Sequence, residues 1–370
     1  MSSQVHIEGP GDLIADIPAM LGFVPERSLV VVTVKQPPGN GAHEVHSALR
    51  VDLPHRARGA DIPLVSEIAH VCSGRDIVAA LAVVVDDRVA PALCPGARAH
   101  RPHRDLVDAL GRKLAEIGVV LTNAWGVTTI EYGAPWWNLD HPYVHGSLPD
   151  PNASMLAVRR VFEDACPLFR SRAELVDLVA ADETLRELVA PVLAEAAADA
   201  QKRFVRAVRI NNPDAYSRMA LWRAIEVIKR SADGRTPAHT ALAEVAVALR
   251  DLTVRDTMFG VTAGAYAVAA EQMWLTLTRA LVGPDRADAA MLLAFSAYRR
   301  GDGILAGIAL ESALAANPEH RMAHLLDVGL RAAMAPDRLE KLVRHGVDSA
   351  AALRVDIGVV QPNTPMEVAK

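Results

Sequence analysis

The chain has few cysteines, few aromatic residues and no long apolar segment. Its three cysteines, Cys72, Cys94 and Cys166, are odd in number and far apart, which disfavours a disulfide framework and favours reduced, buried thiols. No window approaches the roughly 18 uninterrupted apolar residues of a membrane-spanning helix. The first residues also lack a basic region followed by an apolar run. We therefore expect a cytoplasmic, soluble protein.

An excess of positive charge is also absent. The formal net charge is −5, so a nucleic acid is not the expected partner, because nucleic-acid-binding proteins concentrate cations on one surface. Two local clusters keep a nucleic-acid-associated function open as the second alternative. One cluster is Lys202, Arg203, Arg206 and Arg209, and the other is Arg98, His100, Arg101, His103 and Arg104.

The first basic cluster lies on a predicted helix. Phe204, Val205 and Val208 occupy the opposite side of that helix. This pattern is typical of a packed helix whose cations simply face solvent.

Apolar residues are abundant, at 51% of 370 residues, which is enough for two hydrophobic cores. The first part of the chain predicts an α/β domain, with a mixed sheet and flanking helices. The run 77–85 is continuously apolar, as in a central strand buried on both faces. The other predicted strands are 29–34, 48–53 and one or two within 119–131, and the predicted helices are 12–21, capped by Asp12 and ended by Gly22, 63–72, and 104–117, ended by Gly118.

Residues 133–153 are rich in turn-forming and aromatic residues and predict an irregular loop at the domain boundary. The α/β domain is thus assigned to residues 1–150, an all-α domain to 151–350 and a tail to 351–370, of which 361–370 is expected to be loose. The predicted helices after the loop are 154–166, 171–180, 182–189, 191–210 beginning at Pro191, 213–231, 237–251, 264–282, 286–299, 303–316, 320–334 and 336–345.

Residues 286–318 form the most specific pair of predicted helices. Their small and large apolar residues have the spacing of one tetratricopeptide-like helical hairpin. Ala294 and Ala306 would allow close approach of the two helices, and Leu293 and Leu310 would fill the space between them. The remaining matching positions are Ala290, Ala297, Ala313 and Pro318. A single repeat is not stable alone, so this hairpin must pack against neighbouring helices.

Two parts of the sequence carry a family resemblance. The first is Pro18–Val30, with Leu21-Gly22-Phe23-Val24-Pro25 and Ser28-Leu29-Val30 at its centre. The second comprises 249–256, 271–274, 279–280, 292–303 and 309–318. In order and spacing the chain resembles the actinobacterial domain-of-unknown-function family 4192 over about residues 10–335. The family implies no activity, and where many relatives have a cysteine-rich turn this chain has Trp136, Trp137, Asp140 and His141.

A candidate ligand site follows from topology. Open α/β sheets bind ligands beyond the carboxyl ends of their strands, where Asp52 follows one predicted strand and Asp86 and Asp87 follow another. Arg50 could pair with any of these carboxylates or with an anionic ligand. Two adjacent carboxylates could also bind a divalent cation such as Mg²⁺. The competing interpretation is that acidic residues at strand ends only form turns and helix caps.

Other motifs are incomplete. No phosphate-binding glycine loop is present, and Gly146-Ser147-Leu148 lacks the context of a hydrolase nucleophile. Asp140, His141 and His145 are zinc-ligand types without a third strong ligand, so no metal or cofactor is predicted. His320 and His324 are expected at the surface.

Two adjacent charged pairs lie close to the predicted hairpin. Arg250-Asp251 and Arg255-Asp256 are expected to form intramolecular salt bridges that fix helix packing. We do not expect them to be catalytic.

These observations favour an interaction or regulatory protein whose helical half presents a protein-binding surface, with helices 286–316 as the expected location. The alternative is a small-molecule or nucleotide-binding enzyme or sensor that uses Arg50, Asp52, Asp86 and Asp87. The sequence does not choose between enzyme and binding protein, and it does not predict the oligomeric state.

Overall fold

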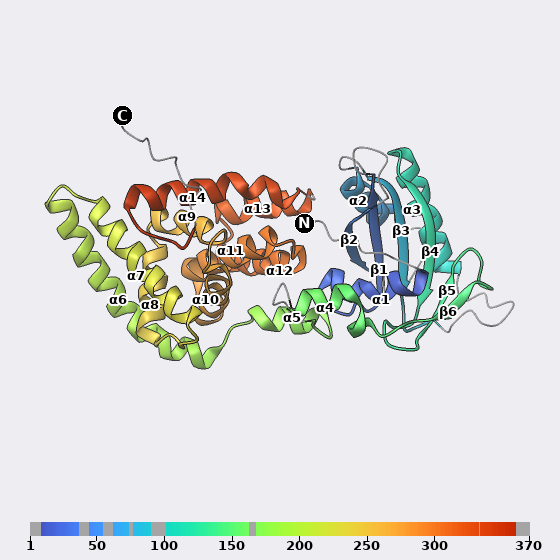
Figure 1. Cartoon of the computed structure of the whole chain (residues 1–370), viewed down its shortest axis with the longest axis horizontal. Coiled ribbons are helices and arrows are strands. Elements are labelled where there is room, and N and C mark those ends of the chain that lie inside the picture. The colour runs from blue at the N-terminus through green and yellow to red at the C-terminus, as the bar shows by residue number, and fades with distance from the viewer. Residues whose placement is uncertain are drawn as a thin grey trace, which may run out of the picture. The chain divides into compact units, whose positions relative to one another are not determined.

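A computed structural model describes residues 9–36, 44–54, 62–73, 77–89, 101–162, 168–332 and 334–359. The chain forms two compact units, Met1–Leu175 and Val176–Lys370. The first contains a mixed sheet with helices and the second is helical, which confirms the predicted fold class (Figure 1). The units divide within helix α5, Arg172–Val179, and not near residue 150. Within the described ranges, no helix combines the length and apolar character needed to cross a bilayer.

Six strands form one sheet in the order β2-β1-β3-β4-β5-β6. Strand β1 is antiparallel to both β2 and β3, whereas β3 and β4 are parallel and are connected through α3. The predicted central strand 77–85 is confirmed as β3. The strands are β1 Ser28–Lys35, β2 Glu44–Asp52, β3 Ile77–Val85, β4 Val120–Val127, β5 Pro135–Asn138 and β6 His145–Ser147.

Helices cover both faces of the sheet. Apolar residues of α2, Ile62–Cys72, and α3, Arg101–Glu116, form a core with alternate strand residues such as Leu29, Ala82 and Trp137. Helix α1, Pro10–Leu21, lies against the other face, where a Cβ added to Gly11 would be 3.3 Å from Trp136 Nε1. Trp136 and Trp137 are successive strand residues and therefore point to opposite faces.

At α1, the predicted C-terminal glycine is confirmed, but the predicted N-cap residue is not. Gly22 ends α1 in the left-handed conformation, with φ of 85°, as glycine readily allows. The start of α1 differs from the prediction, because Gly9 is the N-cap residue and no side chain caps the helix. Asp12 lies instead within the first turn.

The prediction of an irregular loop over 133–153 was wrong for β5 and β6. These strands extend the sheet because two glycines leave room for the two indole rings across the strands. Gly126 pairs with Trp137 and Gly146 pairs with Trp136. A Cβ at Gly126 would lie 2.5 Å from the Trp137 ring, and one at Gly146 would lie 2.9 Å from the Trp136 ring. Glycine is therefore required at both positions.

The segment between the sheet and α5 contains one short 3-10 turn, η2 Pro151–Ala153, and helix α4, Met155–Phe162. The helical unit then runs from the end of α5 to the last described residues. Its helices are α6 Glu183–Arg209, α7 Asp214–Ala232, α8 His239–Leu249, α9 Leu252–Val261, α10 Ala267–Ala280, α11 Gly283–Arg299, α12 Gly303–Ala316, α13 Arg321–Arg331, the 3-10 turn η3 Pro336–Leu339, and α14 Glu340–Leu353.

Several features of the helical unit differ from the prediction. Helix α6 continues through Pro191, where proline removes one backbone donor at an exposed position. Helix α9 was not predicted. The chain after α14 is packed, because Val355 and Ile357 are buried and Gly358 O accepts a hydrogen bond from Ala265 N. Only residues 360–370 of the predicted tail lie outside the described residues.

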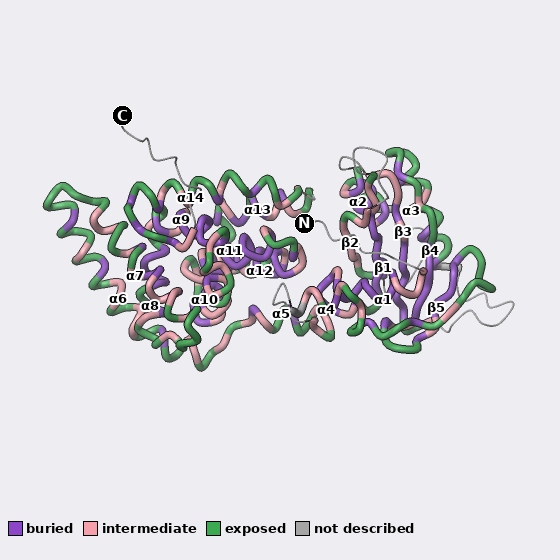
Figure 2. The backbone as a smooth tube through the Cα atoms, in the orientation of Figure 1, coloured by how far each residue is buried: buried purple, intermediate pink, exposed green. Residues whose placement is uncertain are grey.

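Helices α11 and α12 form the core of the helical unit (Figure 2). Ala290, Leu293, Ala294, Ala306 and Leu310 are at most 1% exposed, as the predicted close contact between the two helices requires. The tetratricopeptide-like character of the pair stays a prediction. Because α11 is buried, it offers little surface to a binding partner.

Tyr298 of α11 gives the helical unit a predicted sensitivity to alkali. Burial raises the pKa of Tyr298 to about 12, and its hydroxyl donates to Met334 O at 2.7 Å. Between the unfolded-state pKa near 10 and the folded-state value, only the unfolded chain ionises at this residue. Stability should thus fall as the pH rises above 10, by roughly 2 to 3 kcal/mol in total. Urea unfolding from pH 9 to 12 should show this loss in the native chain but not in Tyr298→Phe, and parallel profiles would contradict it.

Candidate functional site

The predicted site residues lie along one edge of the sheet. Strand register places Ser28, the first residue of β1, beside Asp52 of β2 and Val85 of β3. Asp86 continues β3 by donating its backbone N–H to Val127 O at 3.0 Å. The ends of β2, β3 and β4 therefore meet the start of β1, as the topology argument anticipated.

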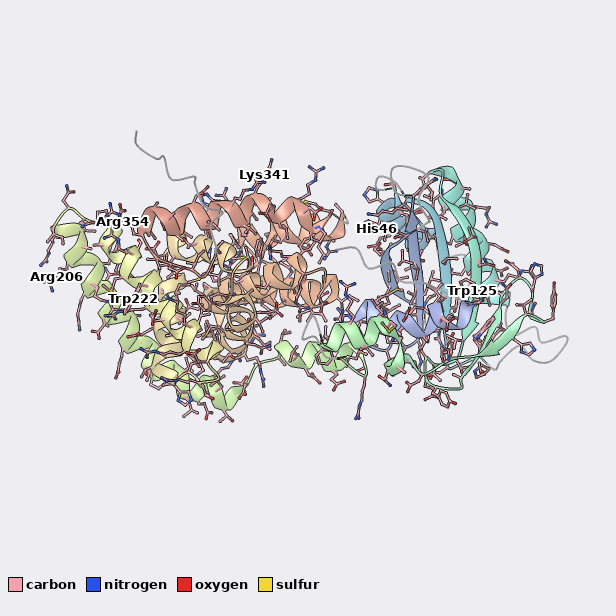
Figure 3. The ribbon with its side chains drawn as sticks, viewed as in Figure 1. His46, Trp125, Arg206, Trp222, Lys341 and Arg354 are labelled. Carbon is pink, nitrogen blue, oxygen red and sulfur yellow. The ribbon has the colours of Figure 1, made fainter. Side chains whose placement is uncertain are left out.

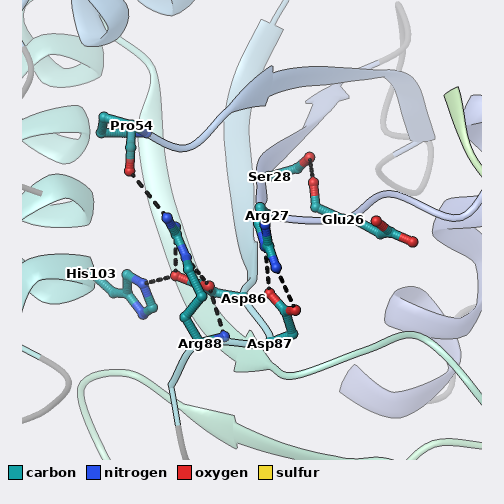
Figure 4. A network of polar contacts seen from close by, with 8 residues as sticks. All are labelled: Glu26, Arg27, Ser28, Pro54, Asp86, Asp87, Arg88 and His103. Atoms are coloured by element: carbon teal, nitrogen blue, oxygen red, sulfur yellow. Dashed lines mark hydrogen bonds and ion pairs between the residues drawn. The ribbon is translucent and has the colours of Figure 1, made fainter. Parts of the chain in front are cut away.

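Asp86 is the buried centre of this edge (Figure 4). Its carboxylate accepts hydrogen bonds from Arg88 Nε at 2.7 Å and from Arg88 Nη2 at 3.0 Å, and it contacts His103 Nε2 at 3.0 Å. Burial acts to raise the pKa of Asp86, but the hydrogen bonds from Arg88 and His103 outweigh burial and lower it. The Asp86 carboxylate therefore links the end of β3 to the first turn of α3.

Asp87 points to a different partner. Arg27 Nε and Nη2 donate to its two carboxylate oxygens at 2.8 and 3.0 Å, and both side chains are more than half exposed, at 52% and 56%. The hydrogen bond from Arg27 lowers the pKa of Asp87. Arg27 has φ of 44°, a backbone region that few residues other than glycine adopt.

Arg50 makes a third, separate pair. It contacts Asp52 in an ion pair, donates from Nε to Ser28 Oγ at 2.8 Å, and lies 5.9 Å from the centre of the Phe23 ring. The four predicted residues thus share one sheet edge, but each carboxylate has its own arginine. In the described part of the chain, no group of three or more histidine, cysteine or acidic residues could hold a metal ion.

Sequence reasoning missed Arg27, Arg88 and the role of His103. Arg88 directly follows Asp86 and Asp87 in the sequence, so it could have been predicted as an ion-pair partner of one of them. His103 was instead assigned to a basic surface cluster, but it is only 6% exposed. Arg98 and His100 of that cluster lie outside the described residues, and Arg104 lies 3.5 Å from Asp140.

The remaining histidine candidates have structural surroundings. Asn138 Oδ1 accepts the backbone N–H groups of Asp140 and His141, which forms the turn between β5 and β6. The surface prediction for His320 was wrong, because His320 is 6% exposed, contacts Asp288 at 3.0 Å and caps α13 through Ala323 N. His324 is exposed as predicted, and its Nε2 contacts Pro318 O.

The two arginine–aspartate pairs near α11 fix helix packing, with one change of partner. Arg255 pairs with Asp256 and with Asp288 of α11. Arg250 pairs with Asp285 at 2.7 Å and not with its neighbour Asp251. Asp251 instead caps α9 and accepts a hydrogen bond from Ser217.

The helical unit carries a groove between α6, α7 and α8, which we call the α6–α7 groove. It has a volume of about 350 Å³. Its polar lining includes Arg203, Arg206, Arg223 and Glu244. Its apolar lining includes Ala200, Ala207, Ile210, Met219, Ala220 and Val247.

Two large apolar side chains that line the α6–α7 groove, Ile210 and Met219, are exposed. Phe204, Val205 and Val208 are exposed too, so their interpretation as a packed helix face was wrong. Figure 3 labels Arg206 and Trp222 at this end of the helical unit. Between residues 204 and 222, the large apolar side chains that are at least 36% exposed are Phe204, Val205, Val208, Ile210, Met219 and Trp222.

The fold thus defines a protein with a mixed α/β unit followed by an all-α unit. The model of the family described as "Domain of unknown function (DUF4192)" matches residues 10–337. The chain belongs to this family, in agreement with the resemblance found in its sequence. Searches of curated proteins and of solved structures gave no match.

Proposed function

We propose that this protein is an interaction protein that binds an acidic, partly apolar segment of a partner protein in the α6–α7 groove. The observation that carries the proposal is an apolar groove that is lined by arginines and by two exposed large apolar side chains, Ile210 and Met219. Contiguous exposed apolar surface is unfavourable in water and typically marks an interaction site.

The apolar part of the groove suits side chains of a bound segment. The groove has room for them because it is lined by the small side chains of Ala200, Ala207 and Ala220. Tyr216 also lines the groove, and the centre of its ring is 5.5 Å from that of Phe204. Aromatic side chains at a partly exposed position offer large contact area at low cost in conformational entropy. An amphipathic helix or an extended peptide could bury its apolar residues here.

The charges of the groove favour an acidic occupant. Arg203 and Arg206 form no ion pair within the described part of the chain. Arg223 pairs with Glu244, but this pair is exposed and its N–O distance is long, at 3.7 Å. Unpaired arginines at the edge of an apolar surface attract carboxylates and accelerate association. Lys202 of the same helix already has an acidic partner, Asp199, at 2.9 Å.

A ligand site at the sheet edge is the weaker proposal. Asp52, Asp86 and Asp87 are each neutralised by a separate arginine, so a divalent cation would have to displace those arginines. The α6–α7 groove differs, because two of its arginines, Arg203 and Arg206, form no ion pair within the described part of the chain.

Peptide selection tests the proposal. Random 16-residue peptides displayed on phage should be selected on the full chain, and enriched sequences should combine excess Asp and Glu with two or more large apolar residues. Binding of synthetic enriched peptides, measured by fluorescence polarisation, should weaken at least tenfold for Arg203→Glu/Arg206→Glu and for Met219→Asp. The matched control is Arg230→Glu, an exposed position of α7 outside the groove.

Three outcomes would overturn the proposal. The first is an enriched set without acidic bias, and the second is unchanged affinity in the double charge reversal. The third is occupancy of the groove by a second copy of the chain or by RNA. Light scattering and titration with a single-stranded RNA detect these occupants directly.

A further inference from the structure

A second hollow in the helical unit has a different chemistry. It lies between the end of α5 and the starts of α6 and α11, with α12 on its other side, and its volume is about 460 Å³. The residues that matter for its chemistry are Arg186, Arg286, Ser312 and Glu311. None of its lining residues is shared with the α6–α7 groove.

Arg286 is a cation without a counter-ion. Its Nη2 donates to Ser312 Oγ at 2.9 Å and to Val179 O at 3.0 Å, so it is held by neutral oxygens. Its Nη1 is buried and has no hydrogen-bond partner. Within the described ranges no carboxylate forms an ion pair with it. A cation in this situation is costly, because neither water nor an opposite charge stabilises it fully.

Arg186 adds a second positive charge to the same hollow. It pairs with Glu183 at 2.8 Å, and Glu183 is 74% exposed. Its Nε is buried without a partner. Burial and the nearby charge of Arg186 lower the pKa of Arg286, which means that the two guanidinium groups repel each other. Glu311 also lies at the hollow.

The N-terminus of α11 also lies at the hollow. Val282 and Gly283 line the hollow, and α11 is 17 residues long. Gly283 has φ of 55°, and a Cβ added there would meet nothing within 4 Å, so the approach to the helix start is open. The partial positive charge of a helix N-terminus favours anions.

We infer that this hollow is a binding site for a small metabolite that carries an oxyanion, a phosphate or a carboxylate, placed between Arg186 and Arg286. Guanidinium groups bind both oxyanions through paired hydrogen bonds. The bound anion would supply the missing counter-ion of Arg286 and would remove the repulsion between the two arginines. The volume admits a ligand larger than the anionic group alone.

Thermal unfolding of the full chain tests this inference. The probes are inorganic phosphate, pyrophosphate and citrate at 10 mM, each compared with NaCl at equal ionic strength. At least one probe should raise the melting temperature beyond the NaCl value, and isothermal titration should give a Kd below 1 mM for it. The comparison of phosphate with citrate decides which oxyanion is preferred.

Two variants link the effect to the hollow. Arg286→Gln and Arg186→Gln should weaken binding of the effective probe at least tenfold. Without a probe, Arg286→Gln should melt at the native temperature or above, because it removes an unneutralised buried charge. Arg344→Gln removes one exposed charge on α14 and should leave probe binding unchanged.

The inference fails if no probe exceeds its NaCl control, or if Arg286→Gln responds to the probes as the native chain does. A marked loss of stability in Arg286→Gln without any probe would also overturn it, because the arginine would then be a structural group. Since the hollow and the α6–α7 groove share no lining residue, failure of one proposal leaves the other standing.

Discussion

Gly346→Ala should destabilise the helical unit by about 3 kcal/mol, one of the two largest effects that we expect from a single substitution. Helices α9 and α14 cross at Gly260 and Gly346. A Cβ at Gly346 would lie 2.9 Å from Thr257 O and would also clash with Gly260 N. Both are backbone atoms, which cannot rotate away as a side chain can, so the helices must separate.

Gly307→Ala is the matched control, since it places the same methyl group in a helix. A Cβ at Gly307 would meet Leu330 Cδ2 at 3.6 Å, an ordinary contact, and alanine favours helix by about 1 kcal/mol over glycine. Urea unfolding should therefore show a loss for Gly346→Ala and no loss for Gly307→Ala. Hydrogen exchange should place the loss in α9 and α14. Equal stability of the two variants would contradict the packing argument.

The sequence was most informative where structure depends on local pattern. The central strand 77–85 was predicted with its observed bounds, because nine successive apolar residues cannot be solvated and suit a strand covered on both faces. Gly22 and Gly118 were predicted as helix ends, and both have the positive φ that glycine allows. The order of α/β and all-α units followed from the change of hydrophobic period along the chain.

Prediction failed where distant residues decide the structure. Residues 135–147 look like a loop because turn-forming residues such as proline, asparagine and glycine interrupt them. The contact of Trp137 with Gly126 on the neighbouring strand, which favours β5, is absent from that local pattern. His320 looked like a surface residue until Asp288, 32 positions earlier, supplied a buried partner. No local pattern contains either relationship.

The candidate sites show the same division. The topology argument correctly placed Arg50, Asp52, Asp86 and Asp87 at one sheet edge. It could not predict which arginine pairs with which carboxylate. The exposure of the apolar side of α6 was missed because Phe204 and Val208 fit the expectation for a packed helix face. Which face of an amphipathic helix finds a partner within its own chain is a tertiary property, and the helical period does not determine it.

Asp86→Ala should destabilise the α/β unit by about 3 kcal/mol, the other of the two largest expected effects. Asp86 is 4% exposed, and its removal leaves His103 Nε2 and the guanidinium of Arg88 without their acceptor. Breaking a buried pair by removing one member costs more than the pair contributes, because the remaining group stays desolvated. Arg88 is 32% exposed and regains some water, which keeps the expected loss near the lower end of such effects.

Asp87→Ala is the adjacent control. Its ion pair with Arg27 is exposed on both sides, where water and salt screen the interaction. We expect no measurable change in urea unfolding for this variant. Substitution of two neighbouring aspartates with the same predicted role would then have different effects on stability, because only Asp86 and its contact with His103 are buried.

The Asp86 carboxylate should also make the α/β unit sensitive to acid. The pKa of Asp86 is lowered in the folded chain, so its stabilising effect is present above the unfolded-state value near 3.9 and is lost as the pH falls through the folded-state value. Native protein should thus lose more stability between pH 5 and pH 2 than Asp86→Asn, which keeps the shape and accepts hydrogen bonds without titrating. If both lose stability equally, acid must act through other carboxylates. The ion pairs of Asp86 with Arg88 and His103 would then contribute packing and hydrogen bonds rather than charge.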